Sequence, residues 1–179
     1  FQMFEKDLPG NNSTGWGTPA DQIGSVPLEV CETINGSWGF NLQDRKHKSD
    51  KELIHYLIKA AGYGSNMLLN VGPMPNGEIQ PKHQSSLKAI GDWLKQNGET
   101  IYGTRKGPIP PNDDYVSTKK EKTVYLHLLN PDIDMIHAEQ FPVRIKGIFD
   151  MKTKAKVAYR NDRFGLSIDV SKLSKDDID

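Results

Sequence analysis

Two glutamates and a tryptophan stand close together in a mostly apolar stretch of the sequence. Glu29 and Glu32 lie within Leu-Glu-Val-Cys-Glu-Thr-Ile, a run that suits a strand. Trp38 follows an Asn-Gly pair at positions 35 and 36, which suits a tight turn. A carboxyl group that is poorly solvated beside an indole keeps its proton at neutral pH, as a sugar-cleaving general acid must. The ordinary alternative is solvated glutamates and a tryptophan packed in the core, and the chemistry of this segment alone favours that alternative.

Glu5 adds a third candidate carboxylate. It follows Phe-Gln-Met-Phe, where a strand is expected to end in a loop. Glycoside hydrolysis is the reaction class that uses two carboxyl groups and a shaped apolar wall, so Glu5, Glu29 and Glu32 are the candidates for acid–base work. The chain has 23 acidic residues, so such neighbourhoods also arise by chance.

Other chemistry-bearing residues exclude several classes of site. The sequence holds no Gly-rich phosphate loop and no Gly-x-Ser-x-Gly elbow. Its single cysteine, Cys31, excludes an internal disulfide and a cysteine-clustered zinc site, and we expect it to be a small buried hydrophobe. The histidines have spacings unlike any metal motif, so structural roles are expected for them, and neither a metal nor a cofactor is predicted. They are His47, His55, His83, His127 and His137.

The charge balance excludes a broad attraction to nucleic acid or to anionic membranes. The 179 residues include 23 Lys and Arg and 23 Asp and Glu, which gives a formal net charge of zero. The longest apolar runs, such as residues 66–71, are far too short to span a bilayer. The partner is therefore expected to be neutral.

Two amphipathic helices are expected in the first hundred residues. Ser49 and Glu52 form a capping-box pattern ahead of apolar residues at helical spacing, and Gly62 is expected to end this helix in a left-handed conformation. Pro81 suits the first residue of a second helix that stops at Gly98. The buried stripe of that helix is expected to consist of Leu87, Ile90, Trp93 and Leu94.

Strands alternate with these helices. The apolar stretch 66–71 predicts a strand buried on both faces, as in a parallel sheet covered by helices. Such alternation indicates an α/β layer or barrel, in which the loops after the carboxyl ends of the strands carry the chemistry. This rule would place Glu5, the turn at 35–36 and the loop 71–77 on one rim.

From residue 104 the pattern changes to short strands. Residues 107–111, Gly-Pro-Ile-Pro-Pro, form a stiff linker. No helical period persists after it, and short strands at fairly even intervals predict a β-sandwich that is truncated at its end. The expected strands are residues 115–118, 123–129, 143–148, 156–158 and 166–170.

Four segments carry a distinctive set of motifs. They are Phe-Gln-Met-Phe-Glu-Lys-Asp-Leu-Pro-Gly at 1–10, Leu-Glu-Val-Cys-Glu-Thr-Ile-Asn-Gly-Ser-Trp-Gly-Phe-Asn at 28–41, Asn-Met-Leu-Leu-Asn-Val-Gly-Pro-Met-Pro-Asn-Gly at 66–77 and Trp-Leu-Lys-Gln-Asn-Gly-Glu-Thr-Ile-Tyr-Gly at 93–103. Together and in this order they resemble the α-L-fucosidases of glycoside hydrolase family 29. The resemblance implies an α/β fold, with the C-terminal portion of a (β/α)8-like catalytic barrel in residues 1–106 and a β-sandwich domain in residues 107–179.

The resemblance also implies an activity. Family members remove terminal α-L-fucose from glycans or glycoconjugates with retention, through a covalent glycosyl-aspartate and with a glutamate as acid/base. The aspartate nucleophile, and the histidines and arginine that hold the sugar, belong to strands before the segment present here. The chain is therefore expected to carry at most half of the catalytic pair and to be inactive alone. The family suggests a secreted, periplasmic or lysosomal location.

Two positions for the acid/base follow from the resemblance. One branch of the family has it in a Tyr-x-Thr-x-Glu-like stretch, which matches residues 1–5 and selects Glu5. A second branch has it in a Pro-Ala-Glu-Val-like stretch, which matches residues 27–30 and selects Glu29. The Ser-Trp-Gly-Phe ending is typical of the first branch, so Glu5 is preferred and Glu29 is the second choice. Trp38 matches a family aromatic that lines the pocket around the fucose methyl group, with core packing as the competing interpretation.

Two other functions stay open at the level of sequence. The chain is alternatively a non-catalytic carbohydrate-binding or structural β-sandwich fragment, for which the α/β half is only a support. Binding of free fucose without turnover would favour that function. A different retaining glycosidase with a similar barrel is the third possibility, which a panel of aryl glycosides distinguishes.

Overall fold

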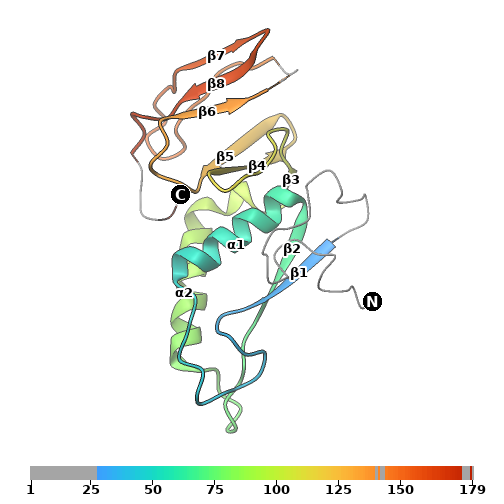
Figure 1. Cartoon of the computed structure of the whole chain (residues 1–179), viewed down its shortest axis with the longest axis vertical. Helices are drawn as coiled ribbons and strands as arrows, with labels where there is room; N and C mark the ends of the chain where they lie inside the picture. Colours follow the sequence, from blue (N-terminus) through green and yellow to red (C-terminus); the bar gives the residue numbers. More distant parts are fainter. Residues whose placement is uncertain (1–27, 140, 142–143, 175–177, 179) are drawn as a thin grey trace.

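The computed structural model describes residues 28–139, 141, 144–174 and 178 (Figure 1). Two parallel strands and two helices form one end of the described chain, and two antiparallel sheets lie at the other end. The chain therefore has a mixed α/β structure, as expected. The elements in chain order are β1 (Leu28–Thr33), α1 (Asp50–Tyr63), β2 (Ser65–Asn70), α2 (Pro81–Asn97), the 3₁₀ helix η3 (Gly98–Thr100), β3 (Arg105–Lys106), β4 (Tyr115–Lys120), β5 (Thr123–Leu128), β6 (Met135–Ala138), β7 (Tyr159–Asp162) and β8 (Gly165–Asp169).

The capping box at the start of α1 is confirmed. The Ser49 hydroxyl accepts a hydrogen bond from the backbone N–H of Glu52, and the Glu52 carboxylate accepts one from the backbone N–H of Ser49. The predicted end at Gly62 is wrong, because the left-handed cap is Gly64, with φ 82°. Gly62 lies inside the helix, where a Cβ would stand 1.9 Å from Cγ1 of Val116 in β4. Gly62 therefore lacks a side chain so that α1 can pack closely against β4, and it does not end the helix.

β1 and β2 form a parallel pair, with Thr33 opposite Asn70 at their carboxyl ends. α1 packs against this pair and covers one of its faces. Burial alternates along β2, and Leu68 on the uncovered face is 52% exposed. The expectation of burial on both faces is therefore wrong for this strand, since the described helices cover a single face.

α2 begins at Pro81 and is followed by Gly98, as predicted. Trp93 is buried, but Leu87 is 37% exposed and does not belong to the buried stripe. His83 and Ser86, nearer the start of the helix, are both fully buried instead. The apolar core at this end of the molecule joins α1, α2, β4 and the residue after β5. Its buried members are Ile54, Ile58, Trp93, Val116 and Leu129.

The C-terminal part contains two three-stranded antiparallel sheets, with strand orders β3-β4-β5 and β6-β8-β7. The expected strands at 115–118, 123–129 and 166–170 correspond to β4, β5 and β8. No strand forms at 144–148, and residues 156–158 contribute only a bridge between Phe149 and Lys156. β3, β6 and β7 are two to four residues long and were not predicted from the sequence.

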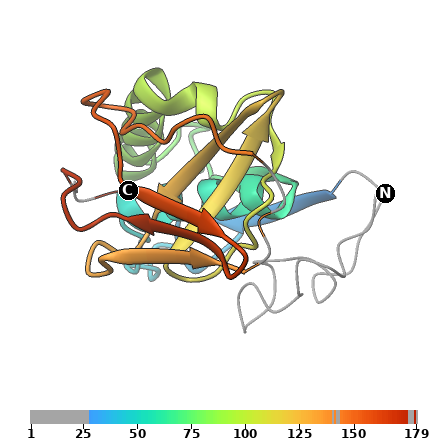
Figure 2. The same ribbon diagram turned by 90° about the horizontal axis from the view of Figure 1, so that it is seen from above.

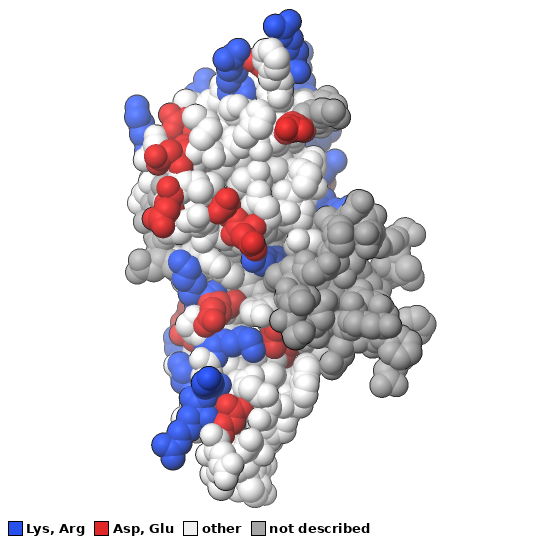
Figure 3. Space-filling model, in the orientation of Figure 1, with Lys and Arg blue, Asp and Glu red and all other residues white. Residues whose placement is uncertain are grey.

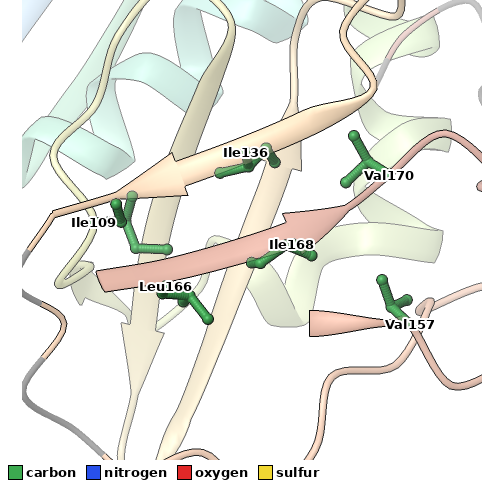
Figure 4. Packing of buried hydrophobic residues seen from close by; sticks show 7 residues of the cluster. Ile109, Ile136, Val157, Leu166, Ile168 and Val170 are labelled. Carbon is green, nitrogen blue, oxygen red and sulfur yellow. The ribbon is translucent and has the colours of Figure 1, made fainter. Parts of the chain in front are cut away.

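The two sheets share an apolar core. In Figure 2 the strands of β6-β8-β7 cross over those of β4 and β5, and Figure 4 shows the apolar side chains that fill the space between the sheets. Side chains of β4 and β5 pack against this core from the other side. The fully enclosed members are Ile109, Ile136, Ala138, Val157, Leu166, Ile168 and Val170.

Candidate functional site

The carboxyl ends of β1 and β2 hold a small network of polar side chains. Thr33 Oγ1 lies 3.1 Å from Asn35 Oδ1 and 3.2 Å from the Ser37 carbonyl oxygen. Asn70 Nδ2 donates to the Trp38 carbonyl oxygen at 2.7 Å and approaches Thr33 Oγ1 at 3.4 Å. Because Thr33 and Asn70 are paired in register, the two strands together fix the segment 35–40, which we call the Trp38 loop.

The segment after β2 closes against the Trp38 loop. A Cβ on Gly72 would lie 2.7 Å from the carbonyl carbon of Gly39 and 2.7 Å from the backbone nitrogen of Phe40. Only glycine permits this approach of two backbones. The Gln80 side chain donates to the Gly72 carbonyl at 3.3 Å and ties the same segment to the start of α2. The loops after β1 and β2 therefore meet, as expected from the parallel order.

Trp38 is held by its backbone while its side chain stays accessible. The indole is 50% exposed, so it is not part of the core in the described residues. An aromatic ring with a fixed main chain and a free face suits contact with an apolar ligand surface.

Of the two glutamates preferred from sequence, the structure describes only Glu29. Glu5 is outside the described residues. Glu29 is the second residue of β1 and is exposed, and it lies four positions before Thr33, about 13 Å along a strand. The structure brings Trp38 together with Asn70 and Thr33, and it places Glu29 toward the opposite end of β1.

Glu32, the third candidate carboxylate, is engaged in hydrogen bonds within the fold. Its carboxylate accepts hydrogen bonds from the Thr33 backbone N–H at 2.8 Å and from Lys48 Nζ at 3.0 Å. Lys48 also donates to the Thr33 carbonyl at 2.8 Å. Burial raises the pKa of the Tyr56 hydroxyl, and the charge of Glu32 and its hydrogen bond with Tyr56 raise it further. Glu32 therefore ties the end of β1 to α1 and to the segment just before it.

A pair of histidines, of which His83 is buried and His47 half-buried, lies next to the Trp38 loop. The rings of His47 and His83 meet edge to face, with centroids 5.4 Å apart. His83 is fully buried, and neither of its ring nitrogens has a hydrogen-bond partner among the described residues. Burial lowers the pKa of His83, repulsion from His47 lowers it further, and Asp44 opposes both effects. The His47 backbone bridges to Asn35, which connects the pair to the Trp38 loop.

Replacing His83 with leucine is expected to raise stability and to flatten its dependence on pH. The ordinary pKa of 6.5 applies to the unfolded chain, and the folded pKa lies below it. As the pH falls through this window, the unfolded state takes up a proton that the folded state refuses, so the free energy of unfolding drops. Leucine removes that uptake and the unpartnered nitrogens, with an expected gain of about 1 kcal/mol at neutral pH.

Urea unfolding of the protein and of the H83L variant between pH 7.5 and 5 measures this effect. His137 is an exposed histidine whose Nδ1 lies 3.1 Å from Ser167 Oγ, so H137L serves as the matched control. The control shows what the same substitution does at an exposed position. An unchanged slope in H83L would contradict the assignment.

Several residues of the site were missed from sequence although a signal existed. Asn70 is a polar residue at the carboxyl end of an apolar strand, directly before Val-Gly-Pro. His83 continues the helical spacing of Ile90 and Trp93 toward the start of α2. Thr33 gave no comparable signal, because threonine is ordinary in a strand.

Other classes of site find no support in the part of the chain that the structure describes. No three His, Cys, Asp or Glu side chains there are placed to hold a metal ion. No helix within those residues is long and apolar enough to cross a membrane. Figure 3 shows positive and negative side chains interspersed over one face of the molecule, in keeping with the zero net charge.

Comparison with known proteins gives consistent matches. The family model described as alpha-L-fucosidase matches residues 1–99. The plasma alpha-L-fucosidase of Homo sapiens is 35% identical over 105 residues, which cover 54% of this chain and 22% of the relative. The tissue alpha-L-fucosidase of Homo sapiens is 34% identical over 120 residues, which cover 62% of this chain and 25% of the relative.

Solved structures match over a longer part of the chain. Alpha-L-fucosidase isoenzyme 1 from Paenibacillus thiaminolyticus has a TM-score of 0.73 at 27% identity, covering 85% of this chain and 37% of that protein. The alpha-fucosidase of Thermotoga maritima has a TM-score of 0.74 at 26% identity, and the match covers 87% of this chain and 38% of that protein. The chain spans about a quarter of the length of the curated relatives that it matches. Because the family model covers more than half of its residues, the chain belongs to the alpha-L-fucosidase family, glycoside hydrolase family 29.

Proposed function

We propose that this chain is the C-terminal part of a retaining α-L-fucosidase. Residues 1–106 would complete a (β/α)8-like catalytic barrel, and residues 107–179 would form part of a β-sandwich. The parallel pair β1–β2, with helices on one face only, supports the first assignment because barrel strands carry their helices on the outside. The apolar core between the two antiparallel sheets supports the second.

The observation that carries the proposal is the Trp38 loop. It sits at the carboxyl ends of two parallel strands, which is where barrel enzymes place their chemistry. Its indole is half exposed on a main chain fixed by Asn70. A 6-deoxy sugar such as fucose presents a methyl group, and a flat apolar ring is a suitable surface for it. One of the similar solved structures is the Thermotoga maritima alpha-fucosidase in complex with fucose.

The proposed reaction has two steps. In the first, the protonated carboxyl group of Glu5 gives its proton to the departing glycosidic oxygen, while an aspartate of the barrel forms a bond to the anomeric carbon. In the second, the Glu5 carboxylate takes a proton from water, the water oxygen attacks the anomeric carbon, and the aspartate leaves. Retention requires the two carboxyl groups to lie roughly 5 Å apart. The aspartate is assigned to no residue of this chain, so the chain by itself is proposed to have no turnover.

The substrates proposed are glycans and glycoconjugates that end in α-L-fucose. We place the protein outside the cytosol, in line with the plasma enzyme among its relatives. No cofactor is needed for this chemistry, because both catalytic groups are carboxyl side chains.

The test is hydrolysis of aryl glycosides by the protein that carries these residues. We expect release of 4-nitrophenol from the α-L-fucoside and not from aryl galactosides, glucosides or xylosides. NMR of the first product should show the α anomer of fucose, as retention demands. A preference for another sugar, or an inverted product, would overturn the proposal. If the 179-residue chain binds free fucose and the parent protein never turns over a fucoside, the carbohydrate-binding alternative is correct.

A further inference from the structure

Backbone hydrogen bonds hold the Trp38 loop only at its start, where Asn35 forms a bridge with His47, among the residues that the structure describes. Residues 37–40 take part in none of the backbone-to-backbone hydrogen bonds seen outside helices and strands among the described residues. The neighbouring bonds begin at Ile34, whose carbonyl accepts from the Lys48 N–H, and at Asn41, whose carbonyl accepts from the Asp44 N–H. The position of the loop therefore depends on side chains.

Asn70 provides the shortest of these side-chain bonds. Its amide reaches the carbonyl of Trp38 itself at 2.7 Å, whereas Asn41 reaches the Ser37 hydroxyl at 3.3 Å. Thr33 contacts the loop one residue earlier, at the Ser37 carbonyl. The same Asn70 nitrogen approaches Thr33 Oγ1, so one amide group joins β2, β1 and the loop. Asn70 itself cannot drift, because it is the last residue of β2 and pairs with Thr33.

We propose that Asn70 is a positioning residue for substrate binding, which sets the indole of Trp38 in place before the sugar arrives. This inference rests on the proposed function, since it concerns the side chain that is proposed to contact the sugar. A loop that is fixed beforehand loses less conformational freedom when it binds a ligand. Asn70 acts through Trp38 and takes no part in proton transfer.

Replacing Asn70 with alanine should raise KM for an aryl α-L-fucoside about three- to tenfold, the effect of one lost hydrogen bond. The turnover number should change less than twofold, because the acid/base group is untouched. N70D keeps the shape of the side chain but puts a carboxylate oxygen against the Trp38 carbonyl, so it should be at least as impaired. N70D also guards against a packing defect that is specific to alanine.

A spectroscopic measurement tests the inference without relying on turnover. Protein labelled with 5-fluorotryptophan gives one fluorine resonance for each tryptophan, and W38F identifies the signal of Trp38 among them. In N70A and N70D we expect this signal to shift or broaden, while the signal of buried Trp93 stays in place. Asn66 is an exposed asparagine of the same strand, so N66A is the matched control and should leave both signals unchanged.

A double-mutant cycle completes the test. If Asn70 acts through the indole, N70A should have no further effect on KM once Trp38 is alanine. Additive effects, or an N70A variant with unchanged KM and an unchanged Trp38 signal, would overturn the inference. If the parent protein hydrolyses no fucoside, the proposed function fails. A Trp38 signal that moves in N70A and not in N66A would still establish that Asn70 positions Trp38.

Discussion

Glu5→Ala is expected to slow the hydrolysis of fucosides with poor leaving groups by about 10²- to 10⁴-fold, the usual contribution of a general acid. Fucosides with activated aryl groups should lose far less in the first step, because such a leaving group departs without a proton. The comparison of kcat/KM for methyl and 2,4-dinitrophenyl α-L-fucosides in the parent and the variant measures this difference.

Glu29→Ala provides the matched control, since both glutamates are candidates and Glu29 is exposed on β1. With Glu5 as acid/base, E29A should show similar changes on both substrates. If the dependence on the leaving group appears in E29A and not in E5A, the role passes to Glu29. Equal losses on both substrates in both variants would count against either assignment.

Gly72→Ala is expected to have the largest effect on the shape of the site. The new methyl group would meet backbone atoms of Gly39 and Phe40 at 2.7 Å, and backbone cannot rotate away as a side chain can. One of the two loops must move, with an expected loss of about 2 kcal/mol in the free energy of unfolding. The displaced Trp38 loop should also lower kcat/KM for aryl α-L-fucosides.

Gly39→Ala is the stability control for this prediction, because a Cβ there has no neighbour within 4 Å. Urea unfolding should find G39A within about 0.5 kcal/mol of the parent. A G72A variant as stable as G39A would mean that the two loops separate at little cost, and the contact would then not hold the site together.

Local signals in the sequence were sufficient for the helices. The reciprocal bonds of Ser49 and Glu52 depend on residues three apart, so sequence alone revealed them. The end of α1 was placed two residues early, because Gly62 and Gly64 are equivalent in sequence terms. The reason for a glycine at 62 is its contact with Val116, which lies far along the chain and is visible only in the structure.

The short strands illustrate a different limit. β7 is Tyr-Arg-Asn-Asp, and Asn and Asp are depleted in strands, so its own sequence argues against the structure that it adopts. β7 forms because its backbone pairs with β8 in an antiparallel ladder. For the candidate site, the sequence indicated Trp38 and the meeting of two loops. It did not indicate Asn70, whose importance comes from a parallel neighbour 37 residues away.

The close packing of Gly62 on Val116 bears on how this family can diversify. Ile54 and Trp93 belong to the same buried cluster as Val116 and Leu129, which lie in the β-rich part of the chain. Recombination could not replace the β-rich half with an unrelated domain, because any replacement would have to present a matching apolar surface to α1. Natural variants of the two halves should accordingly have been inherited together, with substitutions at 62 and 116 compensating for each other.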